Sequence, residues 1–106
     1  MKIVPEILSP NGFLVEDSQG PIAVCWVYFT FDCPRASIDD VYARPDADAV
    51  ALVQAWRSLD RACSDFIRSR GYPVVSTFAD EKLASILKRE GWIVSTKPHV
   101  HVLKVL

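Results

Sequence analysis

The sequence predicts an α/β protein in which helices pack on a mixed β-sheet, and three patterns support that fold class. Residues 22–31 form an apolar run rich in β-branched and aromatic side chains, which is typical of a strand. Residues 46–70 instead repeat apolar side chains at three- and four-residue spacing, which is typical of an amphipathic helix. Another short apolar run, residues 73–78, follows directly. A helix that connects two strands in this way makes the two strands parallel, whereas short turns make the earlier strands antiparallel.

Length and composition describe an ordinary soluble domain. The chain has 106 residues, so we expect a single domain, residues 1–106, with one core. Half of the residues are hydrophobic, 24% are charged, and the formal net charge is -1. A near-neutral charge argues against a nucleic-acid partner, which usually meets a basic stripe. No apolar run approaches the roughly 20 residues of a membrane span, so no membrane partner is expected.

The cysteines and the first twelve residues indicate in which cellular compartment the protein is expected. Cys25, Cys33 and Cys63 are odd in number and form no Cys-x-x-Cys pair, which is typical of buried free thiols in a reducing compartment. The first twelve residues lack the charged and then apolar layout of a signal peptide. Together these features predict a cytoplasmic protein.

The first half of the chain predicts three strands. Residues 13–17 end at the turn signal Ser-Gln-Gly-Pro, and residues 22–31 complete an antiparallel hairpin. A second turn, Asp-Cys-Pro-Arg at residues 32–35, leads into a third strand, residues 36–44. Arg44 precedes a proline, which favours extended geometry and ends that strand.

The long helix is expected over residues 46–70. Its apolar stripe consists of Leu52, Val53, Trp56, Leu59, Cys63, Phe66 and Ile67. Basic side chains in the last turn and Gly71 after it are typical of a helix C-terminus. Asp46 and Asp48 stand at the positive end of the helix dipole, so both are expected to cap the helix.

The remaining residues predict one strand, one helix and two closing strands. Residues 73–78 form the strand, Asp80 is a suitable N-cap for the second helix, and Gly91 ends it. Residues 92–95 and 99–106 are expected to be strands separated at Lys97-Pro98. The predicted order is therefore β-β-β-α-β-α-β-β.

This order, with three local segments, resembles the GNAT superfamily, the acyl-CoA N-acyltransferase fold. GFLVEDSQGPIAVCWVYF resembles the second and third strands of the family around their turn, and ASIDDVYARPD resembles the fourth strand. GYPVVSTFADEKLASILKREGW is similar to the fifth strand and fourth helix, with Gly91-Trp92 where the family usually has Gly-Phe. The resemblance covers about residues 10–106 and implies a GNAT-like fold.

The resemblance also implies a place for acetyl-CoA, if the domain is active. The cofactor would lie between strands at the end of the third predicted strand and accept backbone amides at the start of the long helix. The residues implied are Val41, Ala43, Arg44, Asp48, Ala49, Val50 and Ala51.

Three residues are candidates for catalysis. Asp39 and Asp40 are neighbours on a strand, so they are expected to point to opposite faces. The resemblance implies that one of them could deprotonate an amine acceptor, whereas the structural alternative is a solvated or arginine-paired acid. The usual general acid of the family is a tyrosine near the position of Leu87, and the last helix has none. Tyr42 is the candidate substitute.

Two departures from the family weaken the expected activity. The pyrophosphate loop of the family, Arg/Gln-x-x-Gly-x-Gly/Ala, corresponds here to Arg-Pro-Asp-Ala-Asp-Ala at residues 44–49, with alanine for both glycines. A pyrophosphate within ~4 Å of Asp46 or Asp48 would meet a repulsion of about 1–4 kcal/mol. In addition, only about a dozen residues precede the strand at residues 13–17, so most of the expected acceptor wall is missing.

The sequence therefore predicts a GNAT-like domain with acyl-CoA binding and catalysis lost or weakened, acting through a protein partner or as a homodimer. Trp26 and Tyr28 would form an apolar patch for that contact if their sheet face is uncovered. The alternatives are an active N-acetyltransferase that transfers acetyl from acetyl-CoA to an amine, and a small-molecule or nucleotide binding module. His99 and His101 share a strand face, but no third ligand pattern accompanies them, so no metal is expected.

Overall fold

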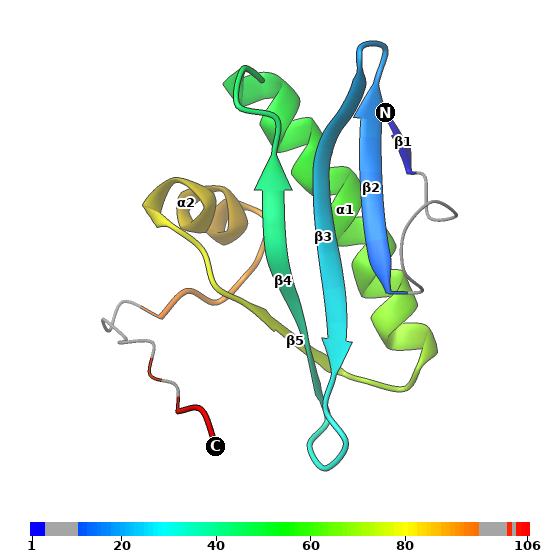
Figure 1. Ribbon diagram of the computed structural model, residues 1–106, viewed down its shortest axis with the longest axis vertical. Helices are drawn as coiled ribbons and strands as arrows, with labels where there is room; N and C mark the ends of the chain where they lie inside the picture. Colours follow the sequence, from blue (N-terminus) through cyan, green and yellow to red (C-terminus); the bar gives the residue numbers. More distant parts are fainter. Residues whose placement is uncertain (4–10, 96–101, 103) are drawn as a thin grey trace.

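The computed structural model describes residues 1–3, 11–95, 102 and 104–106. In this part of the chain a five-stranded sheet and two helices form a mixed α/β fold (Figure 1). The elements along the chain are β1 (Lys2–Ile3), β2 (Gly12–Asp17), β3 (Gly20–Phe29), β4 (Arg35–Ala43), α1 (Ala49–Ser69), β5 (Val74–Thr77) and α2 (Glu81–Arg89).

The sheet has the spatial order β1-β2-β3-β4-β5. Its first three pairings are antiparallel, and β5 joins β4 in parallel after the crossover through α1. The predicted mixed sheet is thereby confirmed. The two-residue strand β1, which pairs with β2, was not among the predicted strands.

Helix α1 covers one face of the sheet, behind the strands in Figure 1. It buries Ala55, Trp56, Leu59, Cys63 and Ile67, which lie on one helical face as the three- and four-residue spacing predicts. The sheet side of the same core includes Val15, Ile22, Cys25, Val27 and Ile38. Because strand side chains alternate between faces, Trp26 and Tyr28 lie on the opposite face of β3.

The observed first residues of the two helices correct one part of the prediction and confirm another. Helix α1 begins at Ala49, and Asp48 is its N-cap, with a carboxylate oxygen that accepts the Ala51 amide at 2.7 Å. The expected cap at Asp46 is wrong, because a proline-containing turn separates Arg44 from the helix and leaves Asp46 outside it. The predicted cap of α2 is confirmed, since Asp80 accepts the Leu83 amide at 2.8 Å.

The predicted closing strand at residues 92–95 is not a strand. Instead, Trp92 packs against Trp56 with ring centroids 6.3 Å apart, and its indole N–H donates to Asp60 at 3.1 Å. A strand requires a neighbouring strand for its backbone, and none pairs with this segment in the described part of the chain. In the second closing strand, residues 102 and 104–106 have no regular structure, and residues 99–101 and 103 lie outside the described residues.

The cysteines follow the prediction only in part. Cys25 and Cys63 are buried free thiols with their sulfur atoms 3.5 Å apart, between β3 and α1. The hydrogen bond with Cys25 and burial raise the pKa of Cys63, so the thiol stays protonated. Cys33 is exposed because it lies in the turn between β3 and β4.

Neither helix in the described residues is both long enough and apolar enough to cross a bilayer.

Candidate functional site

Strand β5 pairs with only the first half of β4. Residues Arg35 to Ile38 pair with Val74 to Thr77, and there β5 ends. The chain then leaves the sheet through Phe78 and Ala79 and enters α2, which Figure 1 shows beside the second half of β4. From Asp39 to Ala43, β4 therefore has no strand on its outer side in the described part of the chain.

A β-bulge interrupts β4 at this point. Trp26 of β3 lies opposite Asp39, but Val24, two residues earlier, lies opposite Tyr42, so β4 holds one extra residue. Asp40 has a φ of 54°, a left-handed conformation that aspartate and asparagine adopt more readily than most residues. The bulge corrects the expectation for the two carboxylates. Asp39 and Asp40 do not serve separate faces, because their carboxylates bind Ser37 and Tyr28, which lie directly opposite each other on β4 and β3.

The space between β4, α1 and α2 is a cleft with a volume of about 370 Å³. Its floor is apolar, with Leu52 and Trp56 from α1 and with Leu83 and Ile86 from α2. Its polar rim consists of Asp39, Asp40, Asp80 and Lys82, and the other lining residues are Ala23, Val41, Ala43, Phe78 and Ala79. We call this space the cleft.

A smaller group of side chains adjoins the cleft. A hollow lined by Tyr28, Asp39, Asp40 and Phe78 shares its last three residues with the cleft. The Tyr28 hydroxyl donates to Asp40 at 2.6 Å, and the Ser37 hydroxyl donates to Asp39 at 2.9 Å. Aromatic rings and carboxylates therefore lie side by side at the open end of the cleft.

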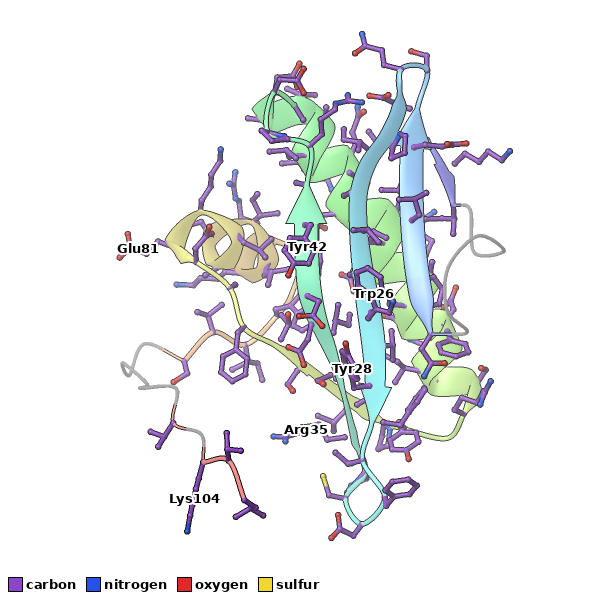
Figure 2. The ribbon with its side chains drawn as sticks, in the orientation of Figure 1. Trp26, Tyr28, Arg35, Tyr42, Glu81 and Lys104 are labelled. Atoms are coloured by element: carbon purple, nitrogen blue, oxygen red, sulfur yellow. The ribbon has the colours of Figure 1, made fainter. Side chains whose placement is uncertain are left out.

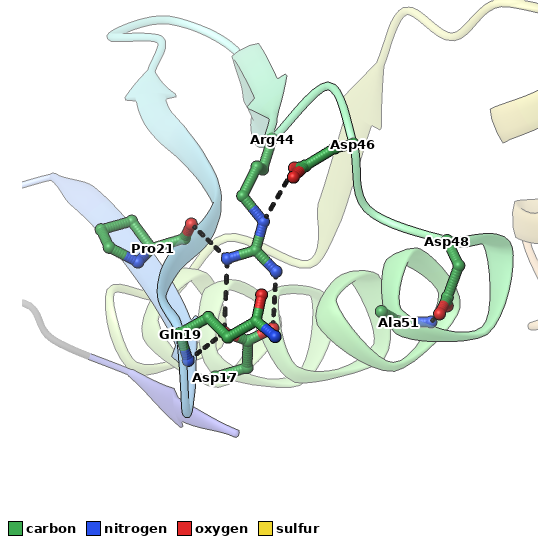
Figure 3. A network of polar contacts seen from close by, with 7 residues as sticks. All are labelled: Asp17, Gln19, Pro21, Arg44, Asp46, Asp48 and Ala51. Atoms are coloured by element: carbon green, nitrogen blue, oxygen red, sulfur yellow. Dashed lines mark hydrogen bonds and ion pairs between the residues drawn. The ribbon is translucent and has the colours of Figure 1, made fainter.

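The segment that leads into α1, residues 44–51, makes polar contacts with other charged groups of the chain (Figure 3). The Arg44 guanidinium donates to both carboxylate oxygens of Asp17, at 2.7 and 3.3 Å, and to the Pro21 carbonyl at 3.3 Å. Its remaining nitrogen, Nε, lies 3.3 Å from Asp46. The ion pair lowers the pKa of Asp17 and raises the pKa of Arg44, because each charge stabilises the other.

The expected cofactor residues fall into two groups. Val41 and Ala43 line the cleft. Arg44 turns instead towards Asp17 (Figure 3) and is not among the residues that line the cleft. Ala49 and Val50 are exposed in the first turn of α1, and the amide of Ala51 is bound to the Asp48 carboxylate.

The expected acid residue does not join the site. Tyr42 is exposed on the sheet face opposite α1, near Trp26 and Tyr28 (Figure 2), and it lies outside the residues that line the cleft. Leu87, at the position of the family's tyrosine, is 3% exposed and belongs to the core. The Ser85 hydroxyl donates to the Glu81 carbonyl one turn earlier.

Sequence reasoning missed three residues of this region. Tyr28 was assigned to the sheet face, but its hydroxyl reaches Asp40 across the strand pair. Counting the β3–β4 hairpin register outward from its turn places Tyr28 opposite Ser37, which would have indicated this proximity. Asp17 and Phe78 carried no such signal, because the partners of both come from distant parts of the chain.

His99 and His101, the histidines considered for a metal, lie outside the described residues. In the part of the chain that the structure describes, no three His, Cys, Asp or Glu side chains are grouped as metal ligands.

The Tyr28–Asp40 hydrogen bond has a measurable consequence. A phenol that donates to a carboxylate is stabilised in its protonated form, so the pKa of Tyr28 is raised above its ordinary value of 10.0. We expect absorbance titration to show one tyrosine that ionises late. Asp40→Asn should lower that pKa towards 10.0, and Tyr28→Phe should remove the transition.

Asp39→Asn is the matched comparison for this titration: the Asp39 carboxylate raises the pKa of Tyr28 through its charge alone, so its loss should lower that pKa less than Asp40→Asn does, with the hydrogen bond left in place. A late transition that Asp40→Asn leaves unchanged would contradict the contact.

The fold is shared with the protein TTHA1254 of Thermus thermophilus. The crystal structure of a mutant of that protein matches with a TM-score of 0.67, and the wild-type structure matches with 0.61. In both alignments the sequences are 23% identical, and the match covers 91% of this chain and 71% of the other. No protein-family model and no curated protein matches the sequence. At this identity the likeness shows the fold alone, and a fold does not determine a function.

Proposed function

We propose that the chain is a GNAT-like domain in which acyl-CoA binding and acyl transfer are lost or weakened, and that it acts through contacts with a protein partner. One observation carries this proposal. Every side-chain nitrogen of Arg44, the cation that would meet a pyrophosphate, is already directed at Asp17, Asp46 or the Pro21 carbonyl.

The balance of charge at the start of α1 supports the proposal. Arg44 pairs with Asp17 and Asp46, and Asp48 caps the helix two residues further on, so these four side chains together carry a negative charge without any ligand. A pyrophosphate within ~4 Å of one such carboxylate meets about 1–4 kcal/mol of repulsion, depending on solvation. A penalty of that size weakens binding by up to about a thousandfold. The Asp48 carboxylate also takes the Ala51 amide, one of the free donors that helix starts offer to phosphates.

The chemistry of acyl transfer is also incomplete in the cleft. A departing thiolate needs a proton donor, and the position expected for it on α2 holds Leu87 in the core. Tyr28 is the phenol beside the carboxylates, but its proton is already donated to Asp40 and its pKa is raised. Both features make it a poor acid.

A second candidate is an active N-acetyltransferase, and the cleft itself favours it. Val41 and Ala43 line a space of about 370 Å³ beside two carboxylates, which fits the expected place of an acetyl-CoA thioester. Asp39 or Asp40 would then take the proton of the amine acceptor. The same cleft would serve a small-molecule binding module without chemistry.

Thermal unfolding with coenzyme A separates these functions. We expect the unfolding temperature to stay within about one degree at millimolar coenzyme A, because no affinity means no linked stabilisation. A dissociation constant a hundredfold below the ligand concentration would add about 2.7 kcal/mol of stability, which is a rise of several degrees or more. Such a rise, or turnover of acetyl-CoA with an amine, would overturn the proposal.

Variants that remove the anionic partners of Arg44 test whether these ion pairs are the reason for the weak binding of coenzyme A. Asp17→Asn with Asp46→Asn leaves the guanidinium without an anionic partner, so we expect the stabilisation by coenzyme A to increase. Asp32→Asn with Asp65→Asn is the matched control, because it removes the same two charges from exposed sites away from Arg44. Equal responses of the two double variants would contradict the electrostatic explanation.

A further inference from the structure

The outer edge of β4 beside the cleft is open to another strand. Strand β5 ends at Thr77, so beyond Ile38 the backbone N–H and C=O groups on this side of β4 meet no strand in the described residues. Beyond the bulge, residues 41–43 return to regular strand geometry, and Val41 and Ala43 line the cleft. An unpaired strand edge is a template on which an extended chain can add itself.

The cleft below this edge suits the side chains of an added strand. Its floor of Leu52, Trp56, Leu83 and Ile86 is apolar, so it favours an apolar side chain that points inward. An extended chain sends every second side chain to the same side, with a repeat of roughly 6.6 Å. Alternate residues of the added chain would enter the cleft, and those between them would point to the opposite sheet face, where Tyr28, Asp39 and Asp40 line the adjoining hollow.

The Trp56 side chain supplies an independent sign of a missing partner. It is 4% exposed and lines the cleft, yet its indole N–H has no acceptor in the described part of the chain. A buried donor without an acceptor destabilises a protein, and most such donors are paired. The nitrogen itself is covered by protein atoms, so the carbonyl of a bound chain would meet it only after the side chains at the floor of the cleft shift.

The charges around the cleft select the kind of chain. Asp39, Asp40 and Asp80 line it together with a single cation, Lys82. In the adjoining hollow, Tyr28 is 46% exposed and Phe78 is 84% exposed beside the first two carboxylates. Carboxylates next to aromatic rings favour a lysine or arginine side chain through charged hydrogen bonds and cation–π contact.

From these four features we infer that the cleft binds an extended basic peptide segment of a partner protein, which pairs with residues 41–43 of β4 as an added strand. The inference rests on the proposed function, since it names the site and the chemistry of the protein contact. The peptide backbone supplies the pairing groups, its apolar side chain fills the cleft, and its cation meets Asp39 and Asp40.

The test uses synthetic pentapeptides and the full chain. Acetyl-Val-Lys-Val-Arg-Val-amide is titrated while nitrogen–proton NMR spectra are recorded, with acetyl-Val-Glu-Val-Glu-Val-amide as the charge-reversed probe. We expect the basic peptide to shift the amide signals of residues 41–43 and the indole signal of Trp56, which Trp56→Phe identifies. Its affinity should exceed that of the acidic peptide by at least about tenfold, the effect of one favourable charged contact.

Two further arms test pairing and charge separately. Methylation of the peptide nitrogens that face β4 removes the donors of the ladder and should weaken binding by about tenfold or more. Asp39→Asn with Asp40→Asn should weaken binding of the basic peptide similarly, and asparagine suits the left-handed backbone at position 40. The double variant Asp32→Asn with Asp65→Asn is the charge-matched control and should bind as the native chain does.

Equal binding of the acidic peptide, indifference to methylation, or no shift at millimolar basic peptide would each overturn the inference. Signals at residues 41–43 that shift with protein concentration alone would overturn it in favour of a second copy of this chain. If the peptides do not bind and coenzyme A also leaves the unfolding temperature unchanged, the strand-addition site is wrong. The proposed loss of acyl-CoA binding is then still supported. Stabilisation by coenzyme A would remove the proposed function itself.

Discussion

Leu59→Ala is expected to lower the free energy of unfolding by about 3–5 kcal/mol. Leu59 is 1% exposed and lies at the middle of the buried face of α1, between Trp56 and Cys63. Truncation to alanine removes apolar area from the core and leaves a cavity that the rigid sheet below cannot close. Urea unfolding followed by far-ultraviolet circular dichroism measures the loss, which is a large part of the stability typical of a small domain.

Arg61→Ala is the control for this experiment, because Arg61 is exposed on the same helix. Its free energy of unfolding should change by no more than about 0.5 kcal/mol, as surface substitutions usually do. A loss below about 1 kcal/mol for Leu59→Ala would contradict its place in the core.

Trp56→Ala is expected to cost a similar amount, about 3–5 kcal/mol, and also to enlarge the cleft. The indole packs against Trp92, whose ring centroid lies 6.3 Å away, and it separates the core from the cleft. Its loss would open the core to water along the path between α1 and α2. The same unfolding measurement, with tryptophan fluorescence as a second probe, checks the result.

Trp56→Phe isolates the unpaired indole N–H. Phenylalanine keeps an aromatic ring but has a smaller volume, which lowers stability. It also carries no N–H, so a buried unpaired donor is removed, and this offsets part of the loss. We expect a loss under about 1.5 kcal/mol, well below that of Trp56→Ala. Equal losses for the two variants would contradict an unpaired N–H in the native protein.

These stability experiments also bear on the cleft. The floor of the cleft is the rim of the core, since Trp56 belongs to both. A ligand that contacts this floor therefore stabilises the folded state directly, and unfolding temperature is a suitable readout for peptide or coenzyme A.

Much of the fold could be predicted from local patterns. The stripe from Leu52 to Ile67 marked α1 because a helix returns a side chain to one face every 3.6 residues. Asp80 and Gly91 marked the limits of α2 through capping chemistry. The segment at residues 92–95 was mispredicted because its apolar residues fit a strand equally well. Only a neighbouring strand would have made it one.

Less of the candidate site could be predicted. Asp39 and Asp40 were predicted to point to opposite faces of their strand, whereas their carboxylates bind the opposed pair Ser37 and Tyr28. The bulge at Asp40 changes that alternation, and no sequence period reports a single extra residue. The role of Arg44 was also open from sequence, because its main partner, Asp17, lies 27 positions away.

By itself the sequence determined the helices, the first hairpins, the parallel crossover and the acidic character of the turn before α1. Each of these depends on neighbours within a few residues, where periodicity, turn chemistry and capping act. Only the tertiary structure decided that Arg44 is bound by Asp17, that Tyr28 meets Asp40, and that β4 keeps an open edge beside Trp56 in the described part of the chain. These features arise where distant segments pack together, and their energies depend on distances that the order of residues does not specify.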